Sequence, residues 1–437
     1  MNSSDDPSSG SPPDPLVSVR RMWGYIRPYR YRSFAVETLM QRVCRTLAVV
    51  AMVLGWPIFT QGARPLKITV GPEQIILRKG LQPFMFQSRK GTLVVQGQAP
   101  APHDFVAPKY AWGWYPGTIR STDRGRTWAP WKPAATQGLG PIFEGTGAEL
   151  KDGTIVILSR LAKASHPKSY FVSDLWESHD DWQTLAGPLQ AKIYLPEAVV
   201  GFADNEQPAP GFTLHRSLIA MPNGDLLATA YGWFKGDATP SEYQPTMNKL
   251  RCFLLRSRDR GRNWTLRSTI AVDPTVGQEG FDEPVLVRLA HGQHSGRFIV
   301  LMRTGRFNPL YQTESDDEGE TWTKPHELAF HGVSPDLVEM KNGTLVAGFG
   351  WRTRQAFVVA RDPSAPVDSQ LGFYLAFSQD QGATWSQVTQ VNNELTTSYA
   401  ALCEARPGEL ILVYDKGWWG HSDRALAARF IQIRKTR

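Results

Sequence analysis

Short apolar runs occur in pairs along most of the chain, and a turn that contains glycine separates the two members of each pair. Six such pairs recur, with their glycines at Gly91, Gly153, Gly224, Gly292, Gly343 and Gly408. Apolar runs flanking Asn-Gly and Asp-Gly steps are typical of β-hairpins. Helical periodicity is nearly absent, so the pattern predicts a chain built from strands.

A second repeat follows these pairs. Four segments, at residues 121–128, 257–264, 315–322 and 378–385, match the pattern Ser-x-Asp-x-Gly-x-Thr/Asn-Trp. A fifth segment, at residues 178–185, keeps the serine, aspartate and threonine but lacks the glycine and the final tryptophan. An aspartate can accept hydrogen bonds from turn amides, glycine supplies positive φ, and tryptophan packs beneath the hairpin. We therefore interpret these aspartates as residues that shape turns.

The two repeats together predict the fold. Six hairpins, each followed by further strand-like sequence, predict an all-β, six-bladed β-propeller over residues 64–437. We expect the last strand, residues 425–433, to pair with residues 68–77 and so to close the ring.

Aligning the six units on their hairpin glycines brings polar side chains into two shared positions. Nine residues before the glycine, where each innermost strand begins, lie Gln82, Glu144, His215, Glu283, Ser334 and Tyr399. Near the end of each second strand lie Gln98, Arg160, Tyr231, Arg303, Gly350 and Asp415. Both positions fall at one mouth of the central channel, where propellers hold ligands. The alternative is a solvated channel without chemistry.

Composition and charge narrow the classes of partner. The chain has 437 residues, of which 15 are tryptophan, and this excess predicts repeated packing or a carbohydrate-binding surface. The formal net charge of +7 is partly local, because residues 1–63 carry seven arginines against four acidic residues. The rest is only mildly basic, so we predict no nucleic-acid partner.

The first 63 residues read as a leader. A Ser-, Pro- and Asp-rich start predicts disorder and is followed by a basic stretch and a 14-residue apolar run, residues 46–59. The run is too short for a comfortable membrane span, and with its small-residue ending it is typical of a secretory signal peptide. A start at Met40 would make it an ordinary signal. We therefore expect a secreted or periplasmic protein, with a retained membrane anchor as the alternative.

The three cysteines do not suggest a disulfide scaffold, and we expect Cys252 and Cys403 to be free thiols on strands. Neither zinc-ligand spacing nor a phosphate loop or dinucleotide fingerprint occurs in the sequence. The sequence therefore predicts no metal and no cofactor.

The Asp-box repeats on six hairpin units resemble the sialidase superfamily of BNR-repeat proteins, over about residues 66–435. The segment from Gly280 to Leu289, continued by Met302-Arg303-Thr304-Gly305, is similar to the sialidase segment with the catalytic glutamate and one arginine of the arginine triad. The segment from Thr397 to Leu402, continued by Leu412-Val413-Tyr414, is similar to the one with the tyrosine nucleophile.

The resemblance implies roles for particular residues. It implies Tyr399 as nucleophile, Glu283 as its base and Arg303 as a ligand of an acidic sugar, and it agrees with the shared position of Glu283 and Tyr399. The family's acid is an aspartate between the first hairpin and the first box, where Asp104 is the only acidic residue. Sialidases themselves depart from the two-carboxylate pattern of most glycosidases.

The chain departs from the family where the first blade should carry an arginine of the triad, since Leu81-Gln82-Pro83 stands there. Arg352 and Arg354 are candidates for the third arginine, Arg160 or Arg216 could supply charge from another blade, and His215 either contacts substrate or is structural.

Three functions therefore stay open. The first is a secreted exo-glycosidase of sialidase type that acts on a glycan or glycoconjugate. The second is a hydrolase or lyase for another sugar on the same fold, and the third is a non-catalytic carbohydrate-binding propeller.

Overall fold

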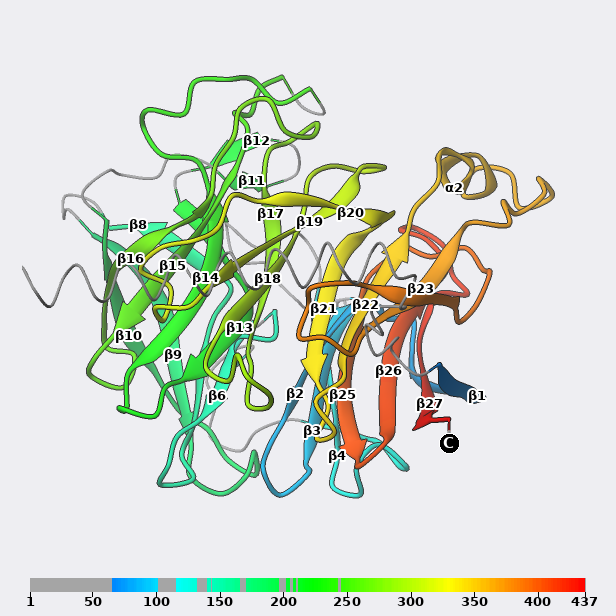
Figure 1. The fold of residues 1–437 in the computed structure, drawn as a ribbon, viewed down its shortest axis with the longest axis horizontal. Coiled ribbons are helices and arrows are strands. Elements are labelled where there is room, and N and C mark those ends of the chain that lie inside the picture. Colours follow the sequence, from blue (N-terminus) through cyan, green and yellow to red (C-terminus); the bar gives the residue numbers. More distant parts are fainter. Residues whose placement is uncertain are drawn as a thin grey trace, which may run out of the picture. The chain divides into compact units, whose positions relative to one another are not determined.

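Antiparallel strands joined by tight turns make up most of the described chain (Figure 1). The computed structural model describes residues 65–100, 115–131, 140–142, 144–165, 170–195, 202–204, 207–209, 211–242 and 245–436. The expected leader, with Met40 and Cys44, lies outside these ranges. Arg64–Arg437 forms one compact unit. In the described ranges no helix has the length and apolar character needed to cross a bilayer.

Four sheets of the described chain have four antiparallel strands each, and in three of them every strand pairs with its neighbour along the chain. The first consists of β2 (Leu81–Gln87), β3 (Leu93–Ala99), β4 (Tyr115–Ser121) and β5 (Ala129–Pro130). The second consists of β17 (Asp282–Arg288), β18 (Phe298–Arg303), β19 (Pro309–Ser315) and β20 (His326–His331). The third consists of β21 (Val333–Glu339), β22 (Leu345–Trp351), β23 (Gly372–Ser378) and β24 (Ser386–Gln390), and the short helix α2 (Arg354–Val359) lies between β22 and β23.

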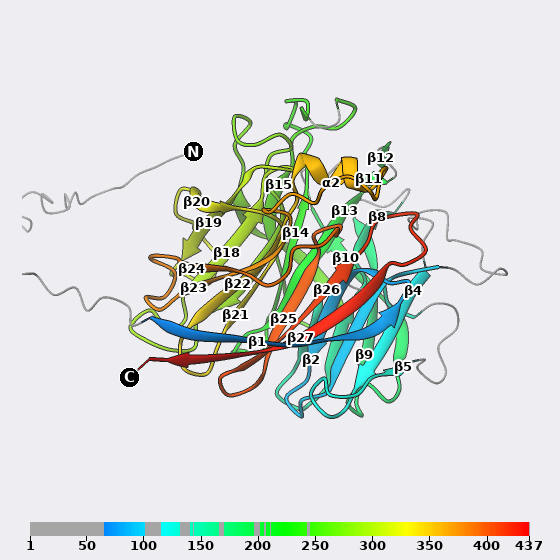
Figure 2. The same ribbon diagram turned by 90° about the vertical axis from the view of Figure 1, so that its right-hand side faces the viewer.

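The fourth of these sheets joins the two ends of the described chain. It has the order β1 (Leu66–Arg78), β27 (Ala425–Lys435), β26 (Glu409–Lys416) and β25 (Ala400–Arg406). Figure 2 shows the blue β1 running along the red β27. The pairing aligns Ile68 with Ile433 and Leu77 with Leu426, which confirms the predicted pairing of the first and last strands.

The remaining strands differ from the expected separate four-stranded sheets. Nine of them form one sheet: β6 (Gly147–Glu149), β7 (Ile155–Leu158), β8 (Leu161–Ala164), β9 (Phe171–Ser178), β10 (Ala186–Tyr194), β13 (Gly211–Ala220), β14 (Leu226–Gly232), β15 (Arg251–Ser257) and β16 (Asn263–Ala271). A two-stranded sheet holds β11 (Phe202–Asp204) and β12 (Gln207–Ala209).

The large sheet arises where the chain leaves the β7–β9 ladder at Arg160. The backbone N–H of Arg160 donates to Ile142, and its carbonyl accepts from Leu214 of β13. The following strand, β8, pairs with both β9 and β13, and β10 pairs in parallel with β16. Two strand groups that we expected to be separate therefore share hydrogen bonds.

Apolar side chains pack between successive groups of strands rather than in one central core. One buried cluster combines Phe86 and Val94 with Ile157 of β7, and another combines Phe373 of β23 with Leu412 of β26. A further cluster joins β25–β27 back to the first sheet through Leu426 and its neighbours. Burial of these faces stabilises the stacking of neighbouring sheets by roughly 25 cal/mol per Å² of apolar surface.

The Asp boxes shape turns, as the sequence analysis interpreted them. In the box at 315–322 the Asp317 carboxylate accepts hydrogen bonds from the backbone N–H groups of Glu320 (3.0 Å) and Thr321 (2.9 Å) and from the Thr321 hydroxyl (2.6 Å). Gly319 has φ +78°, and a Cβ there would meet Leu254 at 2.4 Å. The fixed residue types of the box therefore follow from turn geometry.

The fifth, degenerate box forms the same turn. Asp180 accepts from the backbone N–H of Thr184 at 2.8 Å, and Ser178 accepts from that of Trp182 at 2.9 Å. Trp182 occupies the glycine position with φ +66°, and its side chain is fully buried. Burial of this large side chain offsets a backbone conformation that L-residues seldom adopt.

A residue with positive φ stands at or near the start of the first strand in five strand groups and in the middle of β13 in the other: Gln82 (+51°), Gly145 (+81°), Glu283 (+44°), Ser334 (+45°), Ser398 (+74°) and, in β13, Arg216 (+58°). The strand register shifts at four of these places, for example between Asp282 and Val285. Bulges redirect side chains next to functional sites. This recurring kink sets the direction of the polar side chains at the strand starts.

Candidate active site

Tyr399 and Glu283 meet at the strand starts, although 116 residues separate them in the sequence. Tyr399 directly precedes β25, and Glu283 is the second residue of β17. The Tyr399 hydroxyl donates to the Glu283 Oε1 at 2.5 Å. Tyr399 is half-buried and Glu283 is buried. A phenol is therefore placed against a carboxylate that can accept its proton.

Glu283 is held by further donors. Arg303 Nη1 lies 2.9 Å from its Oε1, and the Ser334 backbone N–H donates to its Oε2 at 2.7 Å. The other nitrogens of Arg303 face Glu279 Oε1 at 2.8 Å and Asp282 Oδ2 at 4.0 Å. One guanidinium thus lies among three carboxyl groups, and every one of its nitrogens faces a protein acceptor.

The protonation of the pair follows from this environment. Burial alone would raise the pKa of Glu283, but the Arg303 charge and the hydrogen bonds from Tyr399 and Ser334 lower it to about 2. Burial and the Glu283 charge raise the pKa of Tyr399 well above its usual range. The resting pair at neutral pH is a neutral phenol that donates to a carboxylate.

The two aligned polar positions contact one another inside several strand groups. Glu144 pairs with Arg160 at 2.7 Å, Gln82 bonds Gln98, and His215 lies with its ring 5.7 Å from that of Tyr231. The Glu283–Arg303 pair repeats the arrangement in β17 and β18. Alignment on the hairpin glycines therefore identified residues that are neighbours in space.

Glu144 has an unusual charge state. Its side chain is buried with that of Arg160, and burial outweighs the arginine charge and raises the pKa of Glu144 to about 7. The Glu283 charge raises it further. A buried carboxyl that titrates near neutrality thus lies in the same charged cluster.

Arg216 connects two sheets. Its Nη2 donates to Ser334 Oγ at 2.6 Å, its Nη1 lies 3.4 Å from Asp336 Oδ2, and its guanidinium stacks 4.9 Å from the Phe84 ring. Because the backbone N–H of Ser334 also donates to Glu283, Arg216 is linked to Glu283 through Ser334.

His215 lies among rings, with Phe84 at 5.8 Å and Tyr231 at 5.7 Å, and its Nδ1 is 3.3 Å from the Pro284 carbonyl oxygen. Burial lowers the pKa of His215 to about 3, so the ring is neutral at pH 7.

Arg352 and Asp415 hold the segment that precedes Tyr399. Asp415 accepts from the Thr396 and Thr397 hydroxyls, from the Thr397 backbone N–H at 3.1 Å and from the backbone N–H of Gln82 at 2.9 Å. Arg352 donates to the Thr397 carbonyl. The loop that presents the phenol is therefore anchored by charged groups.

The structure brings seven of the nine candidate residues to this region: Tyr399, Glu283, Arg303, Arg160, His215, Arg216 and Arg352. Arg354 begins α2, and its guanidinium carbon lies 5.6 Å from the centroid of the Phe307 ring. Asp104 lies outside the described residues, and its role stays a prediction.

Three carboxyls were missed: the buried Glu279 and Asp282 and the half-buried Asp336. Glu279 and Asp282 both precede Glu283 within four residues, so the acidic spacing Glu-x-x-Asp-Glu was a visible signal. Asp336 lies two residues beyond Ser334, where a strand interior predicts an apolar residue, and its partner Arg216 comes from a distant strand.

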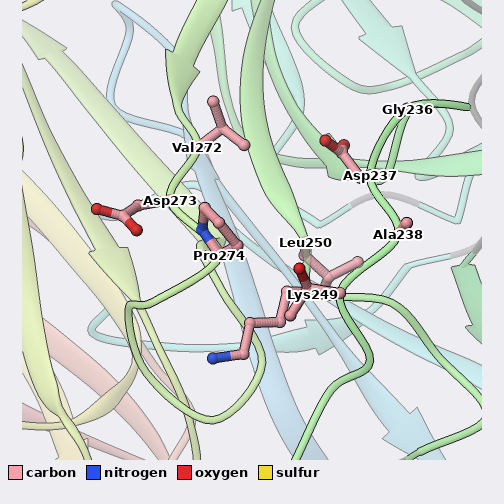
Figure 3. A pocket seen from close by; sticks show the side chains of 9 residues that line it. Gly236, Asp237, Ala238, Lys249, Leu250, Val272, Asp273 and Pro274 are labelled. Atoms are coloured by element: carbon pink, nitrogen blue, oxygen red, sulfur yellow. The ribbon is translucent and has the colours of Figure 1, made fainter.

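A separate hollow of about 110 Å³ lies between the β14–β15 and β16–β17 connections (Figure 3). Its lining includes Asp237 and Lys249, but Asp237 bonds Arg251, and Lys249 donates to the Gly277 carbonyl at 2.8 Å. Its main charged groups are thus engaged within the protein. Across the described ranges, His, Cys, Asp and Glu side chains form no group of three or more suited to a metal ion.

Comparison with known proteins agrees with this architecture. Residues 207–412 match the BNR repeat-like domain family. No curated protein sequence matches the chain. A Dyadobacter fermentans protein of unknown function superposes with a TM-score of 0.59 at 19% identity, over 84% of this chain and 99% of that one.

Two solved glycosidases share the fold. A Penicillium chrysogenum α-L-arabinanase complexed with arabinobiose has a TM-score of 0.57 at 17% identity, over 83% of this chain and 98% of its own. The Hadza microbial sialidase Hz136 has a TM-score of 0.54 at 16% identity, over 82% of this chain and 66% of its own. At these identities the likeness establishes an all-β, propeller-type fold. With its Asp boxes and the matched domain, the chain is similar to the sialidase-like superfamily of BNR-repeat proteins.

Proposed function

We propose that this protein is a retaining exo-glycosidase that uses Tyr399 as its nucleophile. The observation that carries the proposal is the 2.5 Å hydrogen bond from the Tyr399 hydroxyl to Glu283, whose carboxylate is also held by Arg303 and Ser334. A nucleophile within hydrogen-bond reach of a base that is itself oriented by a third group is the usual signature of covalent catalysis.

The residues divide the reaction into two steps. In the first, the Tyr399 oxygen bonds to the anomeric carbon while Glu283 takes the phenolic proton, and Asp104 protonates the departing glycosidic oxygen. In the second, water attacks the same carbon, gives a proton to Asp104, and Tyr399 leaves and regains its proton from Glu283. Because the pKa of Tyr399 is raised and that of Glu283 is lowered, proton transfer must accompany bond formation.

Two observations concern the sugar. The position of the missing family arginine holds the buried Leu81, and the neighbouring Gln82 bonds Gln98, so this side offers neutral groups. Arg303 is already surrounded by carboxyl groups, and an acidic sugar would have to displace one of them. These observations favour a neutral terminal sugar as the second candidate, beside the acidic sugar that the tyrosine nucleophile suggests. The arabinanase likeness is consistent with that candidate.

The fold that carries this site is, in our proposal, a ring of six blades. The nine-stranded sheet then contains two blades, β6–β7–β9–β10 and β13–β16, bridged by β8. Apolar clusters between each consecutive pair of strand groups, including the last with the first, support this count.

We further infer export, on the composition of the leader. N-terminal sequencing of the exported protein should begin near Arg64. Recovery of an intact chain in the membrane fraction would support an anchor instead.

The test of the mechanism uses methylumbelliferyl glycosides of sialic acid, glucuronic acid, galactose and L-arabinofuranose. Wild type should hydrolyse at least one of them, and Tyr399→Phe should lower kcat on it by at least about 1,000-fold with little change in the unfolding midpoint.

Tyr311→Phe is the matched control, because Tyr311 also donates to a glutamate, Glu327 at 3.3 Å, but on β19 and β20. It should retain full activity. Full activity in Tyr399→Phe would remove the nucleophile assignment. No turnover of any substrate by wild type would instead support a binding propeller.

A further inference from the structure

Four aromatic side chains that the proposed reaction does not use gather in three neighbouring connections. Phe307 lies between β18 and β19, Phe357 in α2, and Trp418 and Trp419 between β26 and β27. Their rings form a chain, with centroids 6.1 Å apart for Phe307–Phe357, 5.0 Å for Phe357–Trp418 and 4.9 Å for Trp418–Trp419. We call these four residues the aromatic rim.

The strand connectivity puts the rim beside Tyr399. The hairpin at Gly408 lies at the far end of β25 and β26, so the end of β26 returns to the start of β25. The Asp415 backbone N–H donates to the Tyr399 carbonyl at 3.3 Å, and that of Gly417 donates to Leu395 at 2.7 Å. The connection that holds Trp418 and Trp419 therefore leaves the sheet next to the nucleophile.

Arg352 connects the aromatic rim directly to the loop that precedes Tyr399. Its guanidinium carbon lies 5.6 Å from the centroid of the Trp419 ring, and its Nη2 donates to the Thr397 carbonyl, two residues before Tyr399. Its charge also opposes the burial effect on the pKa of the Tyr399 phenol. The Arg352 side chain thus contacts both Trp419 and the loop that precedes Tyr399.

Trp419 is fixed but uncovered. Its side chain is 38% exposed, whereas Phe307, Phe357 and Trp418 are half-buried. The edge of Trp418 packs against it at 77°, and the Arg352 guanidinium stacks on it. An indole held in one orientation with open surface loses little conformational entropy when a ligand binds it.

We propose that Trp419 is a stacking platform for a neutral sugar ring on the leaving-group side of the bond that is cleaved at Tyr399. The weakly positive C–H face of a sugar complements the negative face of an indole. The sugar whose bond is broken must sit among Glu283, Arg303 and Tyr399, so a ring on the rim belongs to the group that departs. This subsite rests on the proposed function, but binding to it can be measured without turnover.

The first experiment measures binding by saturation-transfer NMR, with lactose, arabinobiose and 3′-sialyllactose as probes. Wild type should show transfer to at least one probe, and Trp419→Ala should reduce its affinity about tenfold, the effect of losing one aromatic contact. Trp419→Tyr should retain binding. Val388→Ala is the control, because Val388 is another exposed apolar residue, on β24.

The second experiment compares kcat/KM on substrates with and without a sugar leaving group. The pairs are 3′-sialyllactose with sialyl fluoride and arabinobiose with arabinofuranosyl fluoride. Trp419→Ala should lower kcat/KM about tenfold on the disaccharide or trisaccharide and leave the fluoride unchanged, because fluoride has no ring to stack.

The outcomes separate the two proposals. If Trp419→Ala loses sugar binding but wild type turns over no substrate, the stacking platform is supported and the proposed glycosidase activity is rejected. Turnover that Trp419→Ala reduces equally on both substrates removes the platform and leaves the glycosidase. Absence of transfer to all three probes with wild type, or unchanged binding in Trp419→Ala, also overturns the platform.

Discussion

The protonation states of the carboxyl groups around Arg303 depend on the balance between burial and pairing with opposite charge. Arg303 is the cation shared by Glu279, Asp282 and Glu283, and burial, with the Glu279 charge, raises the pKa of Asp282 well above its usual range. Asp282 therefore holds its proton while Glu283 stays ionised. The two adjacent carboxyls differ in protonation because Glu283 receives Arg303 Nη1 at 2.9 Å and the Ser334 backbone N–H, whereas Asp282 lies 4.0 Å from the Arg303 Nε.

Glu144 should make stability depend on pH. Its pKa of about 7 lies above the ordinary value of 4.5, so between these values the folded chain keeps a proton that the unfolded chain releases. The free energy of unfolding should therefore fall by up to about 3 kcal/mol as the pH rises from 4.5 to 7. Glu144→Gln should remove this fall, as measured by urea unfolding at several pH values. If the free energies of unfolding of the variant and the wild type differed by the same amount at every pH, the pKa of Glu144 would be ordinary.

At the scale of elements, the Asp boxes are self-contained turns. Each satisfies its backbone amides with its own aspartate, within eight residues, and the glycine lets the turn approach the next sheet closely. The degenerate box shows that the aspartate matters more than the glycine, since Trp182 replaces the glycine and the hydrogen bonds remain.

Asp317→Ala should lower the free energy of unfolding by about 1–2 kcal/mol, because several turn donors lose a charged acceptor and are left partly to water. Its pKa is lowered to about 2 by hydrogen bonds from Thr321, so its contribution should be lost as the pH falls through 2. The neighbouring Asp316→Ala is the control. Asp316→Ala removes a bidentate pair with Arg297 at the surface instead of the acceptor of the turn amides. Equal stability of the two variants would contradict the structural role of the box.

At the scale of the whole molecule, the ends of the described chain are joined in one sheet. Glu73 of β1 accepts from Tyr414 (2.5 Å) and Lys416 (2.6 Å) of β26 and lies 3.4 Å from Arg429 of β27. These contacts span more than 340 residues of sequence and secure the first strand beside the last two.

Glu73→Ala should lower the free energy of unfolding by about 1–2 kcal/mol, since it leaves a partly exposed lysine and arginine without their shared acceptor. A double-mutant cycle with Tyr414→Phe should give a coupling energy above zero, measured by denaturant unfolding. Additive effects of the two substitutions would show that this junction does not depend on their hydrogen bond.

The sequence by itself determined the repeated parts. The hairpin glycines, the Asp boxes and the shared positions of Glu283, Tyr399 and Arg303 could be predicted because each depends on a turn or an alternation within a few residues. The pairing of the first and last strands followed from the need to complete the last blade.

Only the tertiary structure decided the rest. It alone joined two strand groups through β8 and paired Arg216 with Ser334. It also placed Arg303 among three carboxyls and Trp419 against Arg352. These features depend on side-chain directions and on contacts between residues far apart in the chain. A local pattern specifies where a strand starts and turns, whereas the partner of a buried charge is chosen by whatever the folded chain brings within reach.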